Sequence, residues 1–370
     1  MTIKNKVFIT TTSSISCGGN SCDELWDNIC TQKSGITIQK DYFHNSIPAI
    51  GKINSSNSFY KDLIIQCQNI LDKSDLINFD ETLLIIGSSV GGMSTTEDLF
   101  FKTSSYKDID TNSHNIDTIS IILQQKFNFY DDISFSTACT SSANAIGYAY
   151  EVLGKGIYKN ALVVGVDSLC QTTVGGFLSL GVLSSAPCKP FDENRDGMNV
   201  AEAIACVLLE TKSKKNSVEV CGVGYSSDAY HMTMPHLDGA KTAMTNALKL
   251  ANITPNQINY INAHGTGTKA NDTSEANAIS ETFETITKVS STKSITGHTL
   301  GAAGAIEAII CTQAILNQTI PTSTNLNTIE NKEVNFSTST RKEDINYVLS
   351  NSFAFGGNNC SLVFGKVGRN

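Results

Sequence analysis

The sequence predicts an α/β protein whose strands are buried between layers of helices. Short apolar runs, such as 83–86, 161–166 and 204–209, alternate with longer stretches of helical character. Runs of this kind are typical of strands that helices cover on both faces. The rhythm also occurs twice, because each half of the chain has a buried strand ending in a Gly/Ser/Thr loop and a later strand that turns into an Ala/Gly-rich helix. We therefore expect two similar halves.

Composition excludes several functional classes. The 370 residues are 40% hydrophobic and 17% charged, and the net charge of −8 indicates neither nucleic acid nor an anionic membrane as a partner. The 11 cysteines are scattered without a C-x-x-C pair, so we expect reduced thiols, a cytoplasmic protein and no metal site. No signal-peptide core precedes the strand-like segment 7–10, and no apolar run reaches the 18 residues of a membrane helix. We expect a soluble protein without membrane insertion.

The segment 133–153 predicts a strand that turns directly into a helix. Residues 133–136 alternate apolar and polar side chains, and small residues follow. Cys139 stands at the junction, where unpaired backbone N–H groups and the helix dipole favour the thiolate. We therefore expect a lowered thiol pKa and a nucleophilic role. A small buried filler residue explains this segment equally well when it is taken alone.

A polar stretch separates the two halves. Residues 204–210 form another strand-like run, and the polar residues 211–216 follow it. We expect an N-terminal half, 1–216, that carries the nucleophile, and a C-terminal half, 217–370, that carries two candidate histidines. No residue-level repeat relates the halves, so the duplication is predicted from their rhythm alone.

The second half contains three candidate chemical groups. His264 opens a glycine-rich loop, 264–268, after the strand-like run 258–261. Taken alone, a histidine there would more often be an ordinary loop residue. Lys293 and His298 precede a helix start whose small residues permit close backbone packing. A packing helix with a surface lysine is the alternative interpretation.

A turn near the C-terminus offers a further candidate site. Gly356 and Gly357 lie between the strand-like runs 347–349 and 362–364. Paired glycines allow a tight turn or a close approach of the backbone to a ligand. A plain hairpin turn explains the pattern equally well.

Six segments, taken in order, resemble the β-ketoacyl-acyl-carrier-protein synthases of the I and II type. The segments are TACTS at 137–141, PFDENRDG at 190–197, SDAYHMT at 227–233, NAHGTGT at 262–268, STKSITGH at 291–298 and FGG at 355–357. The resemblance covers nearly the whole chain. It implies a thiolase-like fold, with duplicated βαβ halves in αβαβα layers.

The resemblance also implies a reaction, the decarboxylative Claisen condensation. Cys139 would take an acyl chain from a thioester, and malonyl-acyl-carrier protein would lose carbon dioxide and attack it to give 3-oxoacyl-acyl-carrier protein. His264 and His298 would hydrogen-bond the thioester oxygen as neutral imidazoles. Lys293 would supply a fixed positive charge, paired with Glu275. Residues 272–275 could instead form a helix capping box, which leaves the role of Glu275 open.

Further positions follow from the same resemblance. The backbone N–H groups of Cys139 and Phe355 would form the oxyanion hole, with Phe355 and Gly356 in the gate of the acyl pocket. The pantetheine arm would contact Thr233, Thr266 and Thr268. The chain would hold no cofactor of its own, because phosphopantetheine arrives on the carrier protein. Few basic side chains are candidates for binding that acidic partner: Lys61, Lys189, Arg195 and Lys269.

The resemblance leaves the assembly and one alternative function open. A homodimer is expected, and a heterodimer with a related synthase or a chain-length factor is the other possibility. The chain could itself be a chain-length-factor-like partner subunit, but such a subunit would normally have lost the nucleophile. A thiolase would need a second catalytic cysteine, and Cys360 lacks the glycine context.

The chain departs from the family in the segment that usually caps the acyl pocket. Residues 93–127 are short and polar, and Ala354 and Asn358 replace the usual Gly and Thr beside the gate. Such a segment is poorly suited to sealing a long saturated acyl chain, which gains about 0.8 kcal/mol for each buried CH₂. We therefore expect a synthase of fatty-acid or of specialised aryl-polyene or polyketide biosynthesis, with the specialised kind favoured. Its acceptor should be short, rigid or polyunsaturated, or a partner subunit should complete the pocket.

Overall fold

The strands of the first half form one side of a long sheet. The computed structural model describes residues 3–40, 42, 47–76, 79, 81–231 and 233–369. The first-half strands are β1 (Val7–Ser16), β4 (Thr82–Gly87), β5 (Asp131–Phe135), β6 (Asn160–Asp167) and β7 (Ala203–Glu210). They lie in the order β1-β7-β6-β4-β5, with two antiparallel contacts followed by two parallel ones.

The second half repeats this topology strand for strand. Its strands are β8 (Val218–Ser227), β9 (Tyr260–Asn262), β10 (Lys288–Ser290), β14 (Tyr347–Phe353) and β15 (Asn358–Lys366). Their order, β8-β15-β14-β9-β10, again has two antiparallel contacts and then two parallel ones. β12 (Asn335–Phe336) extends this side, and the first residues of β1 pair with β8 to join the halves. The duplication predicted from sequence rhythm is therefore confirmed in the topology, whereas the boundary at residue 216 stays a prediction.

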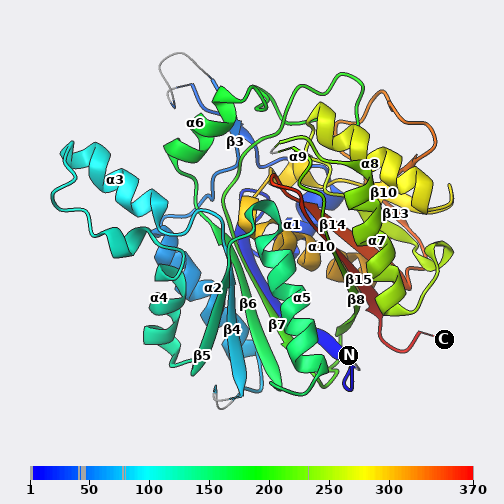
Figure 1. Ribbon diagram of the computed structural model, residues 1–370, viewed down its shortest axis with the longest axis horizontal. Coiled ribbons are helices and arrows are strands. Elements are labelled where there is room, and N and C mark those ends of the chain that lie inside the picture. The colour runs from blue at the N-terminus through cyan, green and yellow to red at the C-terminus, as the bar shows by residue number, and fades with distance from the viewer. Residues whose placement is uncertain are drawn as a thin grey trace.

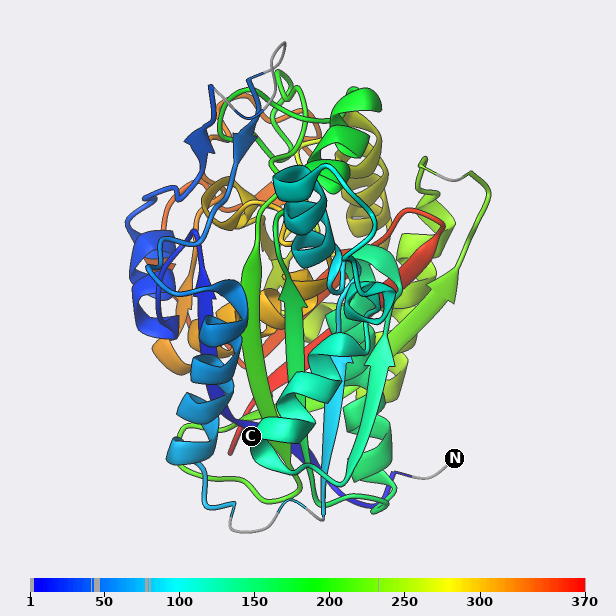
Figure 2. The ribbon, with the colours of Figure 1, turned by 90° about the vertical axis from the view of Figure 1, so that its left-hand side faces the viewer.

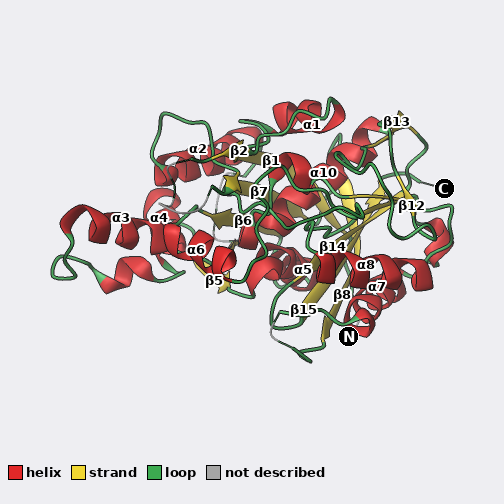
Figure 3. Cartoon of the chain, turned by 90° about the horizontal axis from the view of Figure 1, so that it is seen from above, coloured by secondary structure: helices red, strands yellow, loops and turns green. Residues whose placement is uncertain are grey.

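Helices complete the predicted αβαβα layers. α5 (Ser141–Gly154) and α10 (Ala303–Asn317) pack between the two sides of the sheet in one apolar core. α2 (Phe59–Lys73) and α4 (Thr118–Phe127) cover the outer face of the first half. α7 (Leu237–Ala251) and α8 (Lys269–Thr282) cover that of the second. The two outer layers lie on opposite sides of the molecule in Figures 1 and 3.

The middle helices approach closely because their contact residues are small. A Cβ atom added to Gly304 on α10 would lie 2.5 Å from the backbone nitrogen of Ala143 on α5. The close packing expected from the small residues around 300–306 is thus confirmed. Within the described residues, one helical stretch, Leu300–Asn317, is long and apolar enough by composition to cross a membrane, although Glu307 interrupts its apolar run. Of this stretch, 83% is buried inside the protein, as expected for a helix in the central core.

The segment 93–127 contains more regular structure than its polar sequence indicates. α3 (Met93–Thr103) projects from the body at the left of Figure 1, and the short turn η1 (Thr111–His114) leads back to α4. Figure 2 looks onto this side of the molecule. α6 (Gln171–Ser179) follows β6 and contacts α3. Two further short helices, α1 (Cys22–Cys30) and α9 (Lys293–Thr296), lie near the second half.

Candidate active site

Cys139 lies on a tight turn between a strand and a helix, as the sequence predicts. β5 ends at Phe135, the 3₁₀ turn η2 (Ala138–Thr140) follows, and α5 begins at once. Ala138 has a φ of 52°, in the left-handed region that few residues other than glycine adopt. This strained turn places Cys139 just before the start of α5, where the residue is 8% exposed.

The environment of the sulfur reverses the expected direction of its pKa. Burial raises the pKa of the Cys139 thiol to about 12, although the positive charge of Lys293 opposes the rise. Hydrogen bonds from the backbone of Phe355 and of Cys139 itself also favour the thiolate. The prediction of a lowered pKa was wrong because it counted the helix end and omitted desolvation, which is the larger effect at a fully buried thiol.

Two buried histidines stand side by side at the same cleft. His264 follows β9, and His298 follows α9 and the turn at Gly297. Their rings meet edge to face, with centroids 5.2 Å apart. Burial, with the charge of Lys293, holds the pKa of both well below the usual histidine value. Both imidazoles are therefore neutral at physiological pH.

Contacts at the Nδ1 atoms indicate which nitrogen carries the proton in each ring. The Lys293 ammonium lies 3.5 Å from Nδ1 of His264, and the Leu300 backbone N–H donates to Nδ1 of His298 over 3.2 Å. Because both Nδ1 atoms accept, we assign the protons to the Nε2 atoms. The site thus holds two neutral N–H donors, which suit an oxygen on which negative charge develops.

Lys293 is buried and forms an ion pair, but its partner is a residue that was not predicted from the sequence. Its ammonium forms an ion pair with Glu307 on α10 and also donates to the carbonyl oxygen of His264 over 2.5 Å. The predicted pair between Lys293 and Glu275 is therefore wrong. Glu307 could have been noticed as the lone acidic side chain in an otherwise apolar helix, where an unpaired charge would be costly.

Glu275 supports the histidine loop instead. Its carboxylate accepts from the backbone N–H groups of His264 and Gly265, both at 2.8 Å, and from the side-chain amide of Asn351 at 3.1 Å. Burial raises its pKa to about 7. The capping-box alternative is also wrong, because α8 begins at Lys269 and Glu275 lies well inside the helix.

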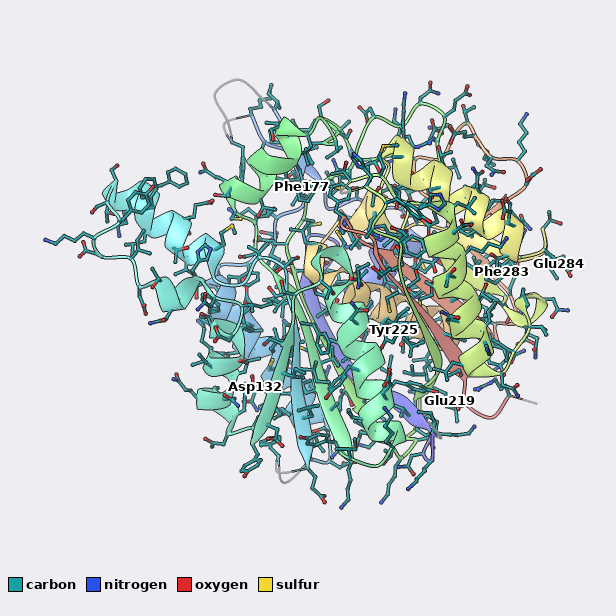
Figure 4. The ribbon with its side chains drawn as sticks, in the orientation of Figure 1. Asp132, Phe177, Glu219, Tyr225, Phe283 and Glu284 are labelled. Carbon is teal, nitrogen blue, oxygen red and sulfur yellow. The ribbon has the colours of Figure 1, made fainter. Side chains whose placement is uncertain are left out.

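A glycine hairpin between β14 and β15 closes the cleft over Cys139. Gly356 and Gly357 have φ values of 87° and 80°, which favour glycine. Phe355 beside them packs against Phe177 of α6, with ring centroids 6.1 Å apart; Phe177 is labelled on α6 in Figure 4. Asn358, which the sequence showed only as a departure from the family, ties this hairpin to the nucleophile helix. Its side-chain oxygen accepts from Thr140 at 2.7 Å and from Asn144 at 2.9 Å.

The cleft brings together most of the predicted site residues. The nucleophile, both histidines, the glycine hairpin and the three threonines all line it. The lining residues include Cys139, His264, His298, Phe355, Gly356, Thr233, Thr266 and Thr268, together with His231 and Asn271, which the prediction had not assigned. Lys293, Glu275 and Glu307 support this lining from behind.

Arg195 is not available at the mouth of the cleft as a surface cation. Its side chain is 1% exposed and pairs with Glu330 over 2.7 Å. It also donates to the backbone oxygens of Asp192 and Lys269. The expectation that Arg195 contacts the acidic carrier protein is therefore wrong. Lys269, in contrast, is exposed and lines a pocket next to the cleft.

An apolar cluster extends the cleft toward α6. It contains Ile50, Val90, Cys170, Val174, Met198, Val200 and Leu300. Met198 also lines the cleft itself, and Phe177 both lines it and packs against the cluster. Side chains of α6 and of both halves thus pack together beside the cleft, and Met93, the first residue of the segment 93–127, packs against the same cluster.

Comparisons with known proteins agree with this geometry. Residues 63–215 match the family model of Beta-ketoacyl synthase, N-terminal domain, and residues 217–327 match that of Beta-ketoacyl synthase, C-terminal domain. The 3-oxoacyl-[acyl-carrier-protein] synthase 2 of Coxiella burnetii is 33% identical over 98% of this chain and 99% of its own length. A ketosynthase solved in complex with its chain length factor, from Xenorhabdus doucetiae, has a TM-score of 0.89 at 29% identity, covering 98% of both chains. A beta-ketoacyl synthase from Burkholderia phymatum has the same TM-score at 26% identity, covering 98% of this chain and 100% of its own.

Proposed function

The chain belongs to the β-ketoacyl synthase family of condensing acyltransferases, and we propose that Cys139, His264 and His298 carry out its reaction. The observation that supports these roles is the meeting of one thiol and two neutral imidazoles in a single buried cleft. The reaction joins an acyl thioester to malonyl-acyl-carrier protein and gives 3-oxoacyl-acyl-carrier protein. A chain-length-factor role is disfavoured because the nucleophile is present on its strained turn.

In the first half-reaction, the Cys139 sulfur attacks the acyl thioester. The carbon–sulfur bond to pantetheine breaks, and the proton of the thiol passes to the departing pantetheine sulfur. The backbone N–H groups of Cys139 and Phe355 lie at the sulfur, where they can stabilise the oxyanion of the tetrahedral intermediate. Gly356 leaves room beside this group, since a Cβ atom at its position would meet nothing within 4 Å.

In the second half-reaction, the malonyl thioester loses carbon dioxide. The electron pair of the broken carbon–carbon bond enters an enolate, whose oxygen accepts from the Nε2–H groups of His264 and His298. The enolate carbon then attacks the acyl carbon on Cys139 and releases the thiolate. Burial and the positive charge of Lys293 keep both imidazoles neutral. Glu307 holds this lysine in place beside them.

The substrate arm and the acyl chain occupy opposite ends of the cleft in this proposal. Thr233, Thr266 and Thr268 line the cleft and can hydrogen-bond pantetheine. Because pantetheine arrives on the carrier protein, the chain needs no cofactor of its own. The acyl chain enters the apolar cluster beside α6. We propose that short, rigid or unsaturated acceptors are preferred, as in aryl-polyene or polyketide synthesis.

The open edge of the sheet supports a homodimer. Within the described residues, β5 is the last strand on its side and pairs only with β4. The hydroxyl of Ser134 on this strand is buried without a hydrogen-bond partner there. An exposed strand edge is a ready template for a second copy or for a related subunit. We propose self-association through β5, in a cytoplasmic enzyme.

The test of the proposed function follows each half-reaction by intact mass. Wild type incubated with carrier proteins that bear an acyl chain should gain the mass of that acyl group on Cys139, and Cys139→Ala should gain none. His298→Ala should still be acylated but should release carbon dioxide roughly 10²- to 10³-fold more slowly. Acylation at another cysteine, or carbon dioxide release by His298→Ala within about threefold of wild type, would contradict these roles.

A further inference from the structure

The wall of the acyl cluster is held by the projecting helix α3. The first turns of α3 contact the segment that leads from β6 into α6: Ser94 and Ser168 share a hydrogen bond of 2.7 Å, and the sulfurs of Met93 and Cys170 lie 3.5 Å apart. Glu97 then reaches the start of α6 itself. Among the described helices and strands, α3 is the main neighbour of α6.

The contact made by Glu97 matches what the start of α6 lacks. The residue before the helix, Cys170, makes no side-chain capping bond. The carboxylate of Glu97 accepts from the backbone N–H of Gln171 at 2.5 Å, from that of Thr172 at 2.7 Å and from the Thr172 hydroxyl at 2.6 Å. A negative charge at this helix end also complements the helix dipole. Glu97 therefore caps α6 from another element.

α6 in turn faces both the acyl cluster and the gate. Val174 is fully buried in the cluster, and Phe177, three residues later, packs against Phe355. The opposite side of α6 is open, since a Cβ atom on Gly176 would meet nothing within 4 Å. A helix that is covered on one side only depends on its end contacts for its position. A shift at its start would be passed to the ring of Phe355, which packs against Phe177 and lines the cleft.

We propose that Glu97 is a positioning residue that sets the acyl-chain specificity of the cleft by fixing α6 against the Phe355 gate. The inference rests on the proposed function, because it assigns the apolar cluster to the acyl chain. Glu97 touches neither the nucleophile nor the histidines. Its loss should therefore change which acceptors are used and leave the malonyl half of the reaction intact.

The test compares Glu97→Ala and Glu97→Gln with the control Asp98→Asn, which removes a neighbouring charge on the exposed side of α3. KM and kcat are measured for acyl-carrier proteins of increasing chain length, beside carbon dioxide release from malonyl-carrier protein. Loss of a helix cap should raise KM for long acceptors roughly 3- to 30-fold in Glu97→Ala. Short acceptors and carbon dioxide release should be unchanged. Glu97→Gln keeps one acceptor oxygen and should lie between Glu97→Ala and wild type.

Two results would overturn the inference. One is a chain-length profile of Glu97→Ala that coincides with that of Asp98→Asn. The other is an equal fall for every acceptor and for carbon dioxide release, which would indicate general damage. A wild type that condenses no acceptor would count against the proposed function instead, so the two failures are distinguishable.

Discussion

At the scale of single residues, burial decides the charge state of the site. The thiol of Cys139 and the imidazoles of His264 and His298 are all held in their neutral forms. A neutral imidazole can donate a hydrogen bond to an enolate oxygen without transferring its proton, because it is a far weaker acid than imidazolium, and this suits the decarboxylation step. A neutral thiol is a poorer nucleophile, so acyl transfer must wait for a substrate that accepts its proton.

The first prediction concerns the pH dependence of Cys139. With a pKa of about 12, the thiolate fraction of the free enzyme rises about tenfold for each pH unit through the neutral range. Alkylation of Cys139 by iodoacetamide, followed by intact mass between pH 6.5 and 9.5, should therefore accelerate in that proportion. Cys139→Ala supplies the background from the other thiols. If the alkylation rate stopped rising below pH 8, the pKa of Cys139 would instead be lowered by the helix end, as the sequence predicted.

A second prediction separates the two buried glutamates. Glu307→Gln should destabilise the fold by about 3–5 kcal/mol, because it leaves the Lys293 ammonium buried without its counter-charge. The double variant Lys293→Met with Glu307→Gln should lose less than the sum of the single losses. Glu275→Gln combined with Lys293→Met should show a smaller coupling energy, since these two side chains meet only through the backbone of His264. Denaturant unfolding measures both cycles, and coupling of Lys293 to Glu275 in place of Glu307 would contradict the assignment.

At the scale of the elements, the site depends on two helices that approach almost to backbone contact. α5 begins at the nucleophile, and α10 carries the partner of Lys293. Their spacing is set where Gly304 meets Ala143. Since neither backbone can move without shifting Cys139 or Glu307, the packing of the middle layer and the geometry of the site are coupled.

The third prediction tests that coupling with matched glycine substitutions. Gly304→Ala should destabilise the protein by about 1–3 kcal/mol, because the new methyl group would overlap the backbone of α5. Gly176→Ala on α6 meets open space and should be neutral or stabilising by roughly 0.5–1 kcal/mol. Thermal unfolding distinguishes them. Equal melting temperatures for the two variants would show that the layer can relax around an added methyl group.

At the scale of the whole molecule, the proposed assembly depends on one strand edge. The carbonyl of Phe135 accepts from Ser88, so Phe135 turns its backbone groups inward from β5. Because successive residues of a strand alternate, the N–H of Ser134 points outward. Asp132, labelled in Figure 4, lies on the same strand.

The fourth prediction follows from this alternation. Ser134→Pro removes an outward N–H group without removing a bond to β4, and it should yield particles of a single chain mass. Wild type and the control Ser134→Ala, which keeps the N–H, should have twice that mass by light scattering. The proposal of pairing through β5 fails if Ser134→Pro remains dimeric, or if wild type is a monomer.

The sequence by itself determined the layered α/β fold, the tight turn at Cys139 and the loops that carry His264, His298 and the paired glycines. These features depend on short segments, in which hydrophobic periodicity, small residues and turn residues determine the local structure. Tertiary structure alone decided that Lys293 pairs with Glu307, that Asn358 binds the nucleophile helix and that Arg195 is buried. It also decided the direction of the Cys139 pKa. The physical reason is that desolvation and ion pairing depend on which distant segments exclude water from a group, and no local pattern encodes that exclusion.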